Sequence, residues 1–280
     1  MPNPRRLRLR HQRFERILMQ RVGVVGAAGR MGRAVCEAVA ADPTLDLVAA
    51  VDPLHAGSQV REIADVESNL VLAAGPEALT EAGVEVVVDF TVAAAVRTNL
   101  AFAAEHGIHA VVGTTGLSDD DLTRIAASFT TSSCLIAANF AIGAVLMMRF
   151  AELAAPWFET AEIIELHHDA KVDAPSGTAR RTAEQMAAAS SDWAADPTTD
   201  HVLGGSRGGE GAGGIPIHSV RLRGLFAHQE VLLGTAGQTL SIRHDTYDRT
   251  CYMPGVVLAV KRVAERPGLT MGLEALLELG

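Results

Sequence analysis

One stretch decides how the first half of the chain folds: Arg21-Val22-Gly23-Val24-Val25-Gly26-Ala27-Ala28-Gly29-Arg30-Met31-Gly32. An apolar strand leads into a turn with glycine at every third position from 26 to 32, and an Ala/Val-rich helix follows over about 33–41. Small residues let the backbone approach a pyrophosphate, which the free N–H groups of a helix N-terminus can bind. The stretch therefore predicts the first unit of a dinucleotide-binding domain; a glycine-rich turn without a ligand is the alternative.

Strands and helices alternate after this unit. A strand over 45–51 ends at Asp52, an acidic residue that can bind the hydroxyl groups of an adenosine ribose. Further strands are predicted over 84–90, 108–112 and 134–138, and helices over 93–105 and 119–129, with Ser118 as an N-cap. This alternation predicts a doubly wound parallel sheet, which binds ligands outside the carboxyl ends of its strands. The loops expected there are Asp89-Phe90-Thr91, Gly113-Thr114-Thr115-Gly116 and Ala137-Ala138-Asn139-Phe140.

The organisation changes near residue 141. An apolar helix over 142–158 is expected to place Met147, Met148 and Phe150 in the core. A strand over 161–166 and a helix over 177–189 follow. The last elements are strands over 215–223, 227–234 and 238–244, read as an antiparallel meander, and helices over 253–265 and 273–279. With the strand over 161–166, the meander would form a mixed sheet.

The predicted fold class is α/β: a Rossmann-like doubly wound parallel sheet, plus a smaller α+β domain with a mixed, largely antiparallel open sheet. We expect a dinucleotide-binding domain over 20–140 with 251–280, and a substrate-binding and oligomerisation domain over 141–250. Residues 1–19 hold six arginines and one glutamate. They are expected to be a disordered basic extension; an organelle transit peptide and a natural start at Met19 are the alternatives.

One loop gathers ionisable residues: Glu165-Leu166-His167-His168-Asp169-Ala170-Lys171-Val172-Asp173-Ala174-Pro175-Ser176-Gly177-Thr178. It joins a strand to a helix, which is where scaffolds display functional groups. Lys171 can donate a proton, and the two histidines can donate hydrogen bonds, polarise a double bond or hold a carboxylate. Ser176-Gly177-Thr178 is an anion site at a helix N-terminus. Beside a dinucleotide domain, the loop indicates hydride transfer to an unsaturated acidic molecule; a solvated charged loop is the alternative.

Composition disfavours several other classes of protein. A net charge of −9 and 4% aromatic residues argue against a nucleic-acid binder. No apolar run could span a bilayer or act as a secretory signal, so we expect a cytoplasmic protein without membrane contact. Cys36, Cys134 and Cys251 are isolated and predicted to be buried thiols, and adjacent histidines rarely reach one ion, so no metal site is expected. The glycine-rich stretch 204–214 is a linker or a substrate lid, with Arg207 as a candidate carboxylate partner.

The motifs together resemble those of the 4-hydroxy-tetrahydrodipicolinate reductase (dihydrodipicolinate reductase) family. The likeness rests on the glycine turn, the three loops of the parallel sheet and the signature from Glu165 to Thr178, and it covers nearly all of 21–280 in order. Actinobacterial members look most similar, judged by Gly214-Ile215-Pro216-Ile217-His218 and Ala227-His228-Gln229-Glu230-Val231. The resemblance implies NAD(P)H-dependent reduction of a cyclic imine-type dicarboxylate with loss of water, in the diaminopimelate route to lysine.

The resemblance also implies roles for individual residues. His167 would donate or accept a proton and Lys171 would be the proton donor beside it. The substrate-binding residues would be His168, Ser176, Gly177, Thr178 and Thr115. The cofactor-binding residues would be Gly26, Ala27, Ala28, Gly29, Arg30, Met31, Gly32, Asp52, Gly113, Thr114, Thr115, Ala137, Ala138, Asn139 and Phe140. The family typically forms a homotetramer through the mixed sheet.

Two departures from the family pattern affect these expectations. Pro53 follows Asp52 where many members carry an arginine for the 2′-phosphate, so the acid favours NADH, yet Arg30 and Arg33 could accept that phosphate. We therefore expect use of both NADH and NADPH. Asp169-Ala170 stands where relatives often carry a basic residue, which lowers the local positive charge. The alternative functions are a two-domain amino-acid dehydrogenase and a non-catalytic nucleotide-sensing protein.

Overall fold

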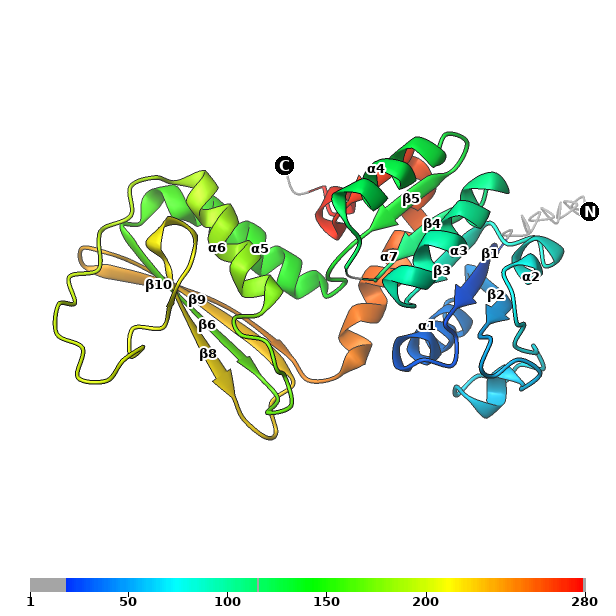
Figure 1. The fold of residues 1–280 in the computed structure, drawn as a ribbon, viewed down its shortest axis with the longest axis horizontal. Helices are drawn as coiled ribbons and strands as arrows, with labels where there is room; N and C mark the ends of the chain where they lie inside the picture. Colours follow the sequence, from blue (N-terminus) through cyan, green and yellow to red (C-terminus); the bar gives the residue numbers. More distant parts are fainter. Residues whose placement is uncertain (1–18, 115, 279–280) are drawn as a thin grey trace, which may run out of the picture.

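Two β-sheets divide the molecule into two lobes (Figure 1). The computed structural model describes residues 19–114 and 116–278. Within these ranges no helix is both long and apolar enough to cross a bilayer. The predicted basic extension lies outside the described residues, apart from Met19.

The first lobe is built on a six-stranded parallel sheet with the strand order β11-β5-β4-β3-β1-β2. Its strands are β1 (Gln20–Val25), β2 (Leu45–Val51), β3 (Val86–Asp89), β4 (His109–Val112), β5 (Ser133–Ile136) and β11 (Gly268–Met271). The central strands are almost continuously apolar because helices cover both faces of the sheet. This arrangement confirms the predicted doubly wound fold.

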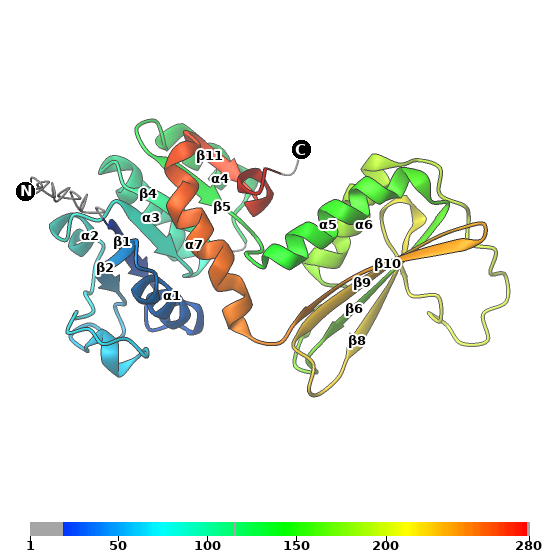
Figure 2. The same cartoon turned by 180° about the vertical axis from the view of Figure 1, so that it is seen from behind.

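The helices of the first lobe form two layers. One face of the sheet carries α1 (Arg30–Ala41) and α7 (Met253–Arg262), which Figure 2 shows in front of it. The other face carries α3 (Ala93–Glu105) and α4 (Asp119–Ser128), with the short α2 (Glu77–Glu81) near the outer strands. Ser118 caps α4 as predicted, since its side chain accepts the N–H of Asp121.

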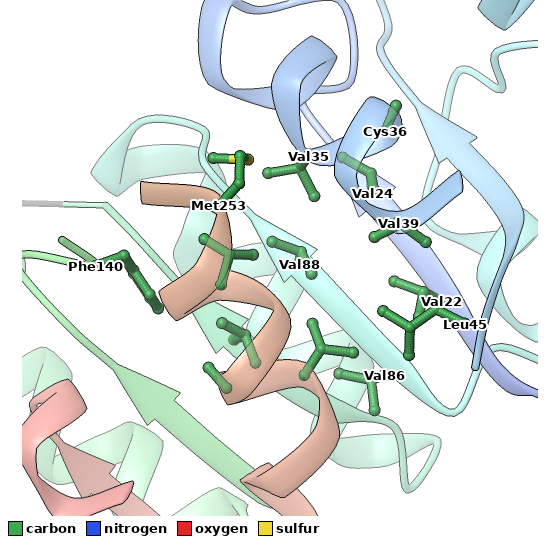
Figure 3. Close-up of a cluster of buried hydrophobic side chains, with 14 of the residues drawn as sticks. Val22, Val24, Val35, Cys36, Val39, Leu45, Val86, Val88, Phe140 and Met253 are labelled. Carbon is green, nitrogen blue, oxygen red and sulfur yellow. The ribbon is translucent and has the colours of Figure 1, made fainter. Parts of the chain in front are cut away.

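Alternate residues of β3 enter two separate hydrophobic cores. Val86 and Val88 pack with side chains of α1 and α7 (Figure 3), whereas Val87 packs with the core beneath α3 and α4. All three valines are buried, and each such burial contributes about 1.5–3 kcal/mol. Both layers of helices are thereby fixed to one sheet, whose carboxyl edge stays open toward the second lobe.

The second lobe holds a mixed sheet with the order β10-β9-β6-β8-β7. Its strands are β6 (Thr160–His167), β7 (Gly209–Glu210), β8 (Pro216–Arg221), β9 (Ala227–Thr235) and β10 (Gln238–Thr246). Two helices, α5 (Ile142–Ala154) and α6 (Gly177–Ala189), cover one face (Figure 1). Their small residues pack on apolar side chains of β6 and β9 such as Ile163 and Val231.

Several predicted elements are corrected by the structure. The three late strands do not form a meander: β9 and β10 form a hairpin, but β6 lies between β8 and β9 and pairs in parallel with β8. Strand β11 was not predicted. Phe150 is 48% exposed rather than in the core, because α5 turns its other side to α6 and the sheet. Met147 is buried and Met148 partly buried, as expected.

Three predicted helices end earlier or become 3-10 turns. The helix predicted over 142–158 is α5 followed by a 3-10 turn, Ala155–Trp157, where Pro156 cannot donate a helical hydrogen bond. Helix α7 likewise passes into a 3-10 turn at Val263–Glu265. The last predicted helix is the 3-10 turn Leu273–Leu276. The other short turns of this kind are Val60–Glu62, Ala212–Gly214 and Arg249–Tyr252.

Candidate active site

A cavity of about 290 Å³ lies between the carboxyl edge of the parallel sheet and the facing ends of β6, β9 and β10. The predicted site residues that line it are Met31, Gly113, Ala138, Asn139, Phe140, His167, Ser176 and Thr178. The predicted residues that do not line it are Gly26, Ala27, Ala28, Gly29, Arg30, Gly32, Asp52, Thr114, Ala137, His168, Lys171 and Gly177. Thr115 lies outside the described residues.

Two glycines shape the turn after β1. Gly26 has a φ of +74°, a conformation that favours glycine. A Cβ atom on Gly32 would lie 2.1 Å from the carbonyl oxygen of Gly26, so only glycine allows this approach. Helix α1 begins at Arg30, three residues earlier than predicted, with Gly29 as its N-cap. The free N–H groups of its first turn therefore lie beside the glycine turn.

Asp52 holds the glycine turn in place. Its Oδ2 accepts the N–H of Ala28 at 3.1 Å, and its Oδ1 accepts the N–H of Leu54 at 3.1 Å. The Nδ1 atom of His55 lies 3.0 Å from the same Oδ1. Asp52 is buried, so the acid at the end of β2 joins the first two strand-helix loops.

Hydrogen bonds also order the loops after β3, β4 and β5. Asp89 is fully buried and accepts hydrogen bonds from the N–H and hydroxyl of Thr91 and from Asn99, all at 2.7–2.8 Å. Burial outweighs these bonds and raises the pKa of Asp89. Thr114 donates its hydroxyl to the carbonyl of Thr91 at 2.8 Å. Asn139 accepts the N–H at the start of α5, so each loop is anchored before any ligand binds.

A close aromatic contact fixes Gly113 on this edge. A Cβ atom there would lie 1.9 Å from the ring of Phe90, which packs 5.6 Å from the ring of Phe140. All three residues line the cavity. Any larger residue at position 113 would push the Phe90 ring from its place.

His167 enters the cavity from the end of β6. Its Nδ1 atom lies 2.5 Å from Oε2 of Glu165, which is fully buried. Burial lowers the pKa of His167; Glu165 opposes this shift, and the charges of Lys171 and Arg221 add to it. The imidazole is therefore neutral at neutral pH, and Nε2 is the ring nitrogen left for the cavity.

Lys171 and His168 do not line the cavity. The Nζ atom of Lys171 lies 2.8 Å from both carboxylate oxygens of Asp173. This bond holds the pKa of Asp173 below its ordinary value. Asp173 does not bind the start of α6; the N–H of Ser176 there is accepted by Glu165. His168 is exposed, and its neighbour Asp169 pairs with Arg223.

Sequence reasoning missed two histidines that line the cavity. His228 lies 2.7 Å from Asp245 through Nδ1 and accepts the N–H of Phe226 through Nε2. His244 packs on the start of α5, where a Cβ atom on Gly143 would lie 2.5 Å from the ring. Burial lowers the pKa of His244. Both histidines follow the alternation of ordinary strands, so no local motif marked them, although His228 falls within the family-like run from 227 to 231.

Arg207 is not near this cavity. Its guanidinium pairs with Glu162 and Asp196, and these three residues line a different cavity that does not include His167. The candidate carboxylate partner therefore does not reach this cavity in the described structure. The glycine-rich stretch lies at the end of the mixed sheet remote from the first lobe (Figure 1).

Among the described residues, no group of three or more His, Cys, Asp or Glu side chains could hold a metal ion. Cys36 and Cys134 are buried free thiols, as predicted, whereas Cys251 is only half-buried. Burial raises the pKa of Cys36 to about 12, so its thiol stays protonated.

Comparison with known proteins gives consistent matches over both lobes. A family model described as dihydrodipicolinate reductase, N-terminus, matches residues 20–140, and one for the C-terminus matches 143–277. The chain is 49% identical over 263 residues to the 4-hydroxy-tetrahydrodipicolinate reductase of Mycobacterium sp. (strain KMS). It is 50% identical over 265 residues to that of Nocardia farcinica (strain IFM 10152). Each match covers 92% of this chain and 99% of the relative.

A solved structure extends the likeness to three dimensions. Dipicolinate-bound dihydrodipicolinate reductase from Paenisporosarcina sp. TG-14 aligns with a TM-score of 0.82 and 38% sequence identity. The alignment covers 92% of this chain and 99% of that one.

Proposed function

This chain belongs to the dihydrodipicolinate reductase family, and from that premise we propose that it is an NAD(P)H-dependent oxidoreductase of lysine and diaminopimelate biosynthesis. It reduces (2S,4S)-4-hydroxy-2,3,4,5-tetrahydrodipicolinate with one hydride and one proton, releases water and gives tetrahydrodipicolinate. The observation that carries this proposal is the single cavity lined both by the carboxyl edge of the nucleotide-type sheet and by His167, Ser176 and Thr178.

The glycine turn and its neighbouring loops fit a nicotinamide dinucleotide. Gly26 and Gly32 bring the backbone to the N-terminus of α1 with no side chain in the way, which suits a pyrophosphate. Gly113, Asn139 and Phe140 lie where the cavity meets the sheet and would receive the nicotinamide. When bound, the cofactor supplies the hydride; the protein orients the partner molecules and handles the proton.

The other side of the cavity fits a small dicarboxylate. Ser176 caps α6 with its side chain, and Thr178 lies in the first turn, where free N–H groups favour an anion. The related structure with 38% identity holds dipicolinate, itself a dicarboxylate. We propose that Ser176, Gly177 and Thr178 bind one carboxylate and that His168 and Thr115 help to bind the other.

Proton transfer is divided between two residues. His167 presents Nε2 as a neutral acceptor, because Nδ1 is held by Glu165 and burial lowers its pKa. Lys171 carries three N–H donors and is the proton donor. It must leave Asp173 to do so, and a substrate carboxylate is the anion that can replace that partner. In this mechanism, binding of the substrate carboxylate releases Lys171 from Asp173 and brings its ammonium group to the substrate in the same step.

We extend the proposal to the organisation of the molecule. Residues 20–140 with 251–280 bind the nucleotide, and residues 141–250 bind the substrate and form a homotetramer through the mixed sheet. Support comes from the face of that sheet opposite α5 and α6, where the apolar side chains of Ile164 and Leu232 are only partly buried in the described protomer. Free cysteines suit the reducing cytoplasm, which we propose as its location.

Paired kinetics with the two cofactors test this function. Purified protein mixed with the product of the preceding synthase should oxidise both NADH and NADPH, followed at 340 nm, with similar kcat/KM. The negative charge of Asp52 would repel the 2′-phosphate of NADPH, whereas the positive charges of Arg30 and Arg33 near the glycine turn would attract it. The two effects oppose each other, so neither cofactor is strongly preferred. No oxidation of either cofactor would refute the proposed reaction, and a preference for NADPH of a hundredfold or more would refute dual use alone.

A further inference from the structure

The buried carboxylate of Glu165 has all its hydrogen-bonding positions occupied. Oε1 accepts Nη2 of Arg221 at 2.8 Å and the N–H of Ser176 at 3.2 Å. Oε2 accepts Nη1 of Arg221 at 2.8 Å and lies 2.5 Å from Nδ1 of His167. Two acceptor sites on each oxygen are thereby used. Burial alone would raise the pKa of Glu165, but the hydrogen bonds from Arg221 and its other partners lower it, so the group is ionised.

An ionised carboxylate can only accept hydrogen bonds, so His167 must donate through Nδ1. A neutral imidazole carries one proton, and its position is set by the partner of the other nitrogen. Glu165 therefore holds the proton on Nδ1 and leaves the lone pair on Nε2. Without this contact, nothing among the described residues would favour that tautomer over the reverse.

The same carboxylate also fixes the anion-binding side of the cavity. It binds the backbone N–H of Ser176, whose side chain in turn accepts the N–H of Ala179 and caps α6. Arg221 adds a second link, because its Nη2 donates to the carbonyl of Asp173 at 2.6 Å. The ion pair of the buried Glu165 with the partly buried Arg221 thus connects the end of β6, the end of β8 and the start of α6.

We infer that Glu165, supported by Arg221, is a positioning residue that sets the tautomer of His167 and aligns it with the anion-binding start of α6. The inference rests on the proposed function, which supplies the roles of the two groups it aligns. Glu165 does not line the cavity, so it acts on bound molecules only through His167 and Ser176.

The same strand offers a matched control. Glu162, three residues earlier on β6, also binds a histidine and an arginine, since its carboxylate contacts His218 and Arg207. Glu162 and Arg207 line the other cavity, away from His167. Glu162→Gln removes the same charge from the same strand and leaves the active cavity unchanged.

The tautomer can be measured without substrate. Protein labelled with ¹⁵N-histidine is examined by solid-state NMR, and the His167 signals are assigned by their loss in His167→Gln. The wild type and Glu162→Gln should show His167 protonated on Nδ1 at pH 7.5. Glu165→Gln should lose that preference. A wild-type His167 protonated on Nε2 would overturn the inference while leaving the proposed reaction untouched.

Kinetics give a second readout. Because Glu165 opposes the fall in the pKa of His167, Glu165→Gln should shift the acidic limb of the kcat/KM profile to lower pH. Lys171, Asp173 and Arg221 also face this region and are unchanged in that variant. We expect kcat to fall at least about tenfold for Glu165→Gln and less than about twofold for Glu162→Gln.

A charge-neutral pair separates positioning from stability. Glu165→Gln leaves Arg221 without its partner, so the double variant Glu165→Gln with Arg221→Met removes both charges together. If Glu165 serves only to neutralise Arg221, the double variant regains wild-type kcat and pH profile, and the inference fails. If Glu165 positions His167, the double variant is folded by circular dichroism and thermal melting, yet still slow.

Discussion

At the scale of single residues, Lys171 is bound to Asp173 in the free protein, whereas the proposed reaction requires it to contact the substrate. Its side chain is 20% exposed, and its ammonium group is bound to both oxygens of Asp173. This ion pair holds Lys171, the proposed proton donor, near His167 but outside the cavity lining. In the proposed mechanism a substrate carboxylate competes with Asp173 for the same cation, so breaking this ion pair would add to the free-energy cost of substrate binding.

Replacing Lys171 by alanine should lower kcat by at least about 10²-fold, since a positioned proton donor contributes that much. The chain has one other lysine, Lys261, on the surface of the first lobe, and Lys261→Ala is the matched control with unchanged kcat at pH 7.5. Steady-state kinetics on both variants decide the matter. A change in KM alone for Lys171→Ala would assign this residue to binding and not to proton transfer.

The sequence identified residues that line the cavity better than the residues that hold those side chains in place. His167, Ser176 and Thr178 stand in a motif with unusual spacing, and all three line the cavity. Glu165 was noted as part of that motif without a role, and Arg221, 56 positions away, was not noted. Their partnership depends on the parallel pairing of β6 with β8, which no local pattern reveals.

At the scale of elements, helix α7 is fixed to the loop after β5 by a backbone contact. A Cβ atom on Gly255 would lie 2.1 Å from the carbonyl oxygen of Phe140, which lines the cavity. The helix can approach the loop this closely only because position 255 has no side chain. The placement of this cavity-lining loop therefore depends on a residue that does not itself line the cavity.

Gly255→Ala should destabilise the protein by about 1–3 kcal/mol, the usual cost of an added group in a packed core. Thermal melting would show this as a lower Tm. Gly204→Ala serves as the control, because a Cβ atom at that exposed position meets nothing within 4 Å. Equal melting temperatures for the two variants would show that α7 can shift freely away from Phe140.

A second link between elements makes stability depend on pH. Lys261 of α7 binds Asp42 at the end of α1, and its hydrogen bond, with that of Thr44, lowers the pKa of Asp42 from 3.8 to about 2. A carboxylate whose pKa is lower in the folded than in the unfolded state stabilises the fold at any pH above its unfolded-state pKa. This contribution is lost as the pH falls through the folded-state pKa. The stabilisation is therefore complete above about pH 5 and fades between about pH 4 and 2.

The difference in Tm between the wild type and Lys261→Met should follow the same course. It should be constant from pH 5 to 8 and shrink as the pH is lowered from 4 toward 2. A difference that grows on acidification would contradict the assignment of this ion pair.

The limits of elements were predictable where a cap or a close glycine marked them. Helices α3 and α6 begin and end as predicted, and Ser118 caps α4. The start of helix α1 was predicted three residues too late, because Gly32 was read as part of the turn. Gly32 instead lies in the first turn of the helix, where only glycine can pack against the carbonyl of Gly26. Strand β11 was not predicted because it has only four residues, the first of which is Gly268, and so short a segment shows no clear alternation of apolar and polar side chains.

At the scale of the whole molecule, alternation of strands and helices predicted the first lobe, while the second lobe was predicted only in outline. A mixed sheet was expected, but the order of its strands follows from tertiary packing: β8 returns beside β6 after the long 190–214 segment. Sequential hairpins would have kept Arg221 away from Glu165. The two lobes meet at the cavity because the chain crosses between them before α5 and again before α7 (Figure 2).

The central claim is that one cavity between the lobes holds the nicotinamide and a dicarboxylate together. The most direct test is a crystal structure of the protein with NADH and dipicolinate. The account predicts a nicotinamide ring beside Gly113, Asn139 and Phe140, with the dicarboxylate between that ring and His167, and Lys171 moved from Asp173 to a carboxylate. A dicarboxylate bound away from His167, or a nicotinamide outside the cavity, would contradict it.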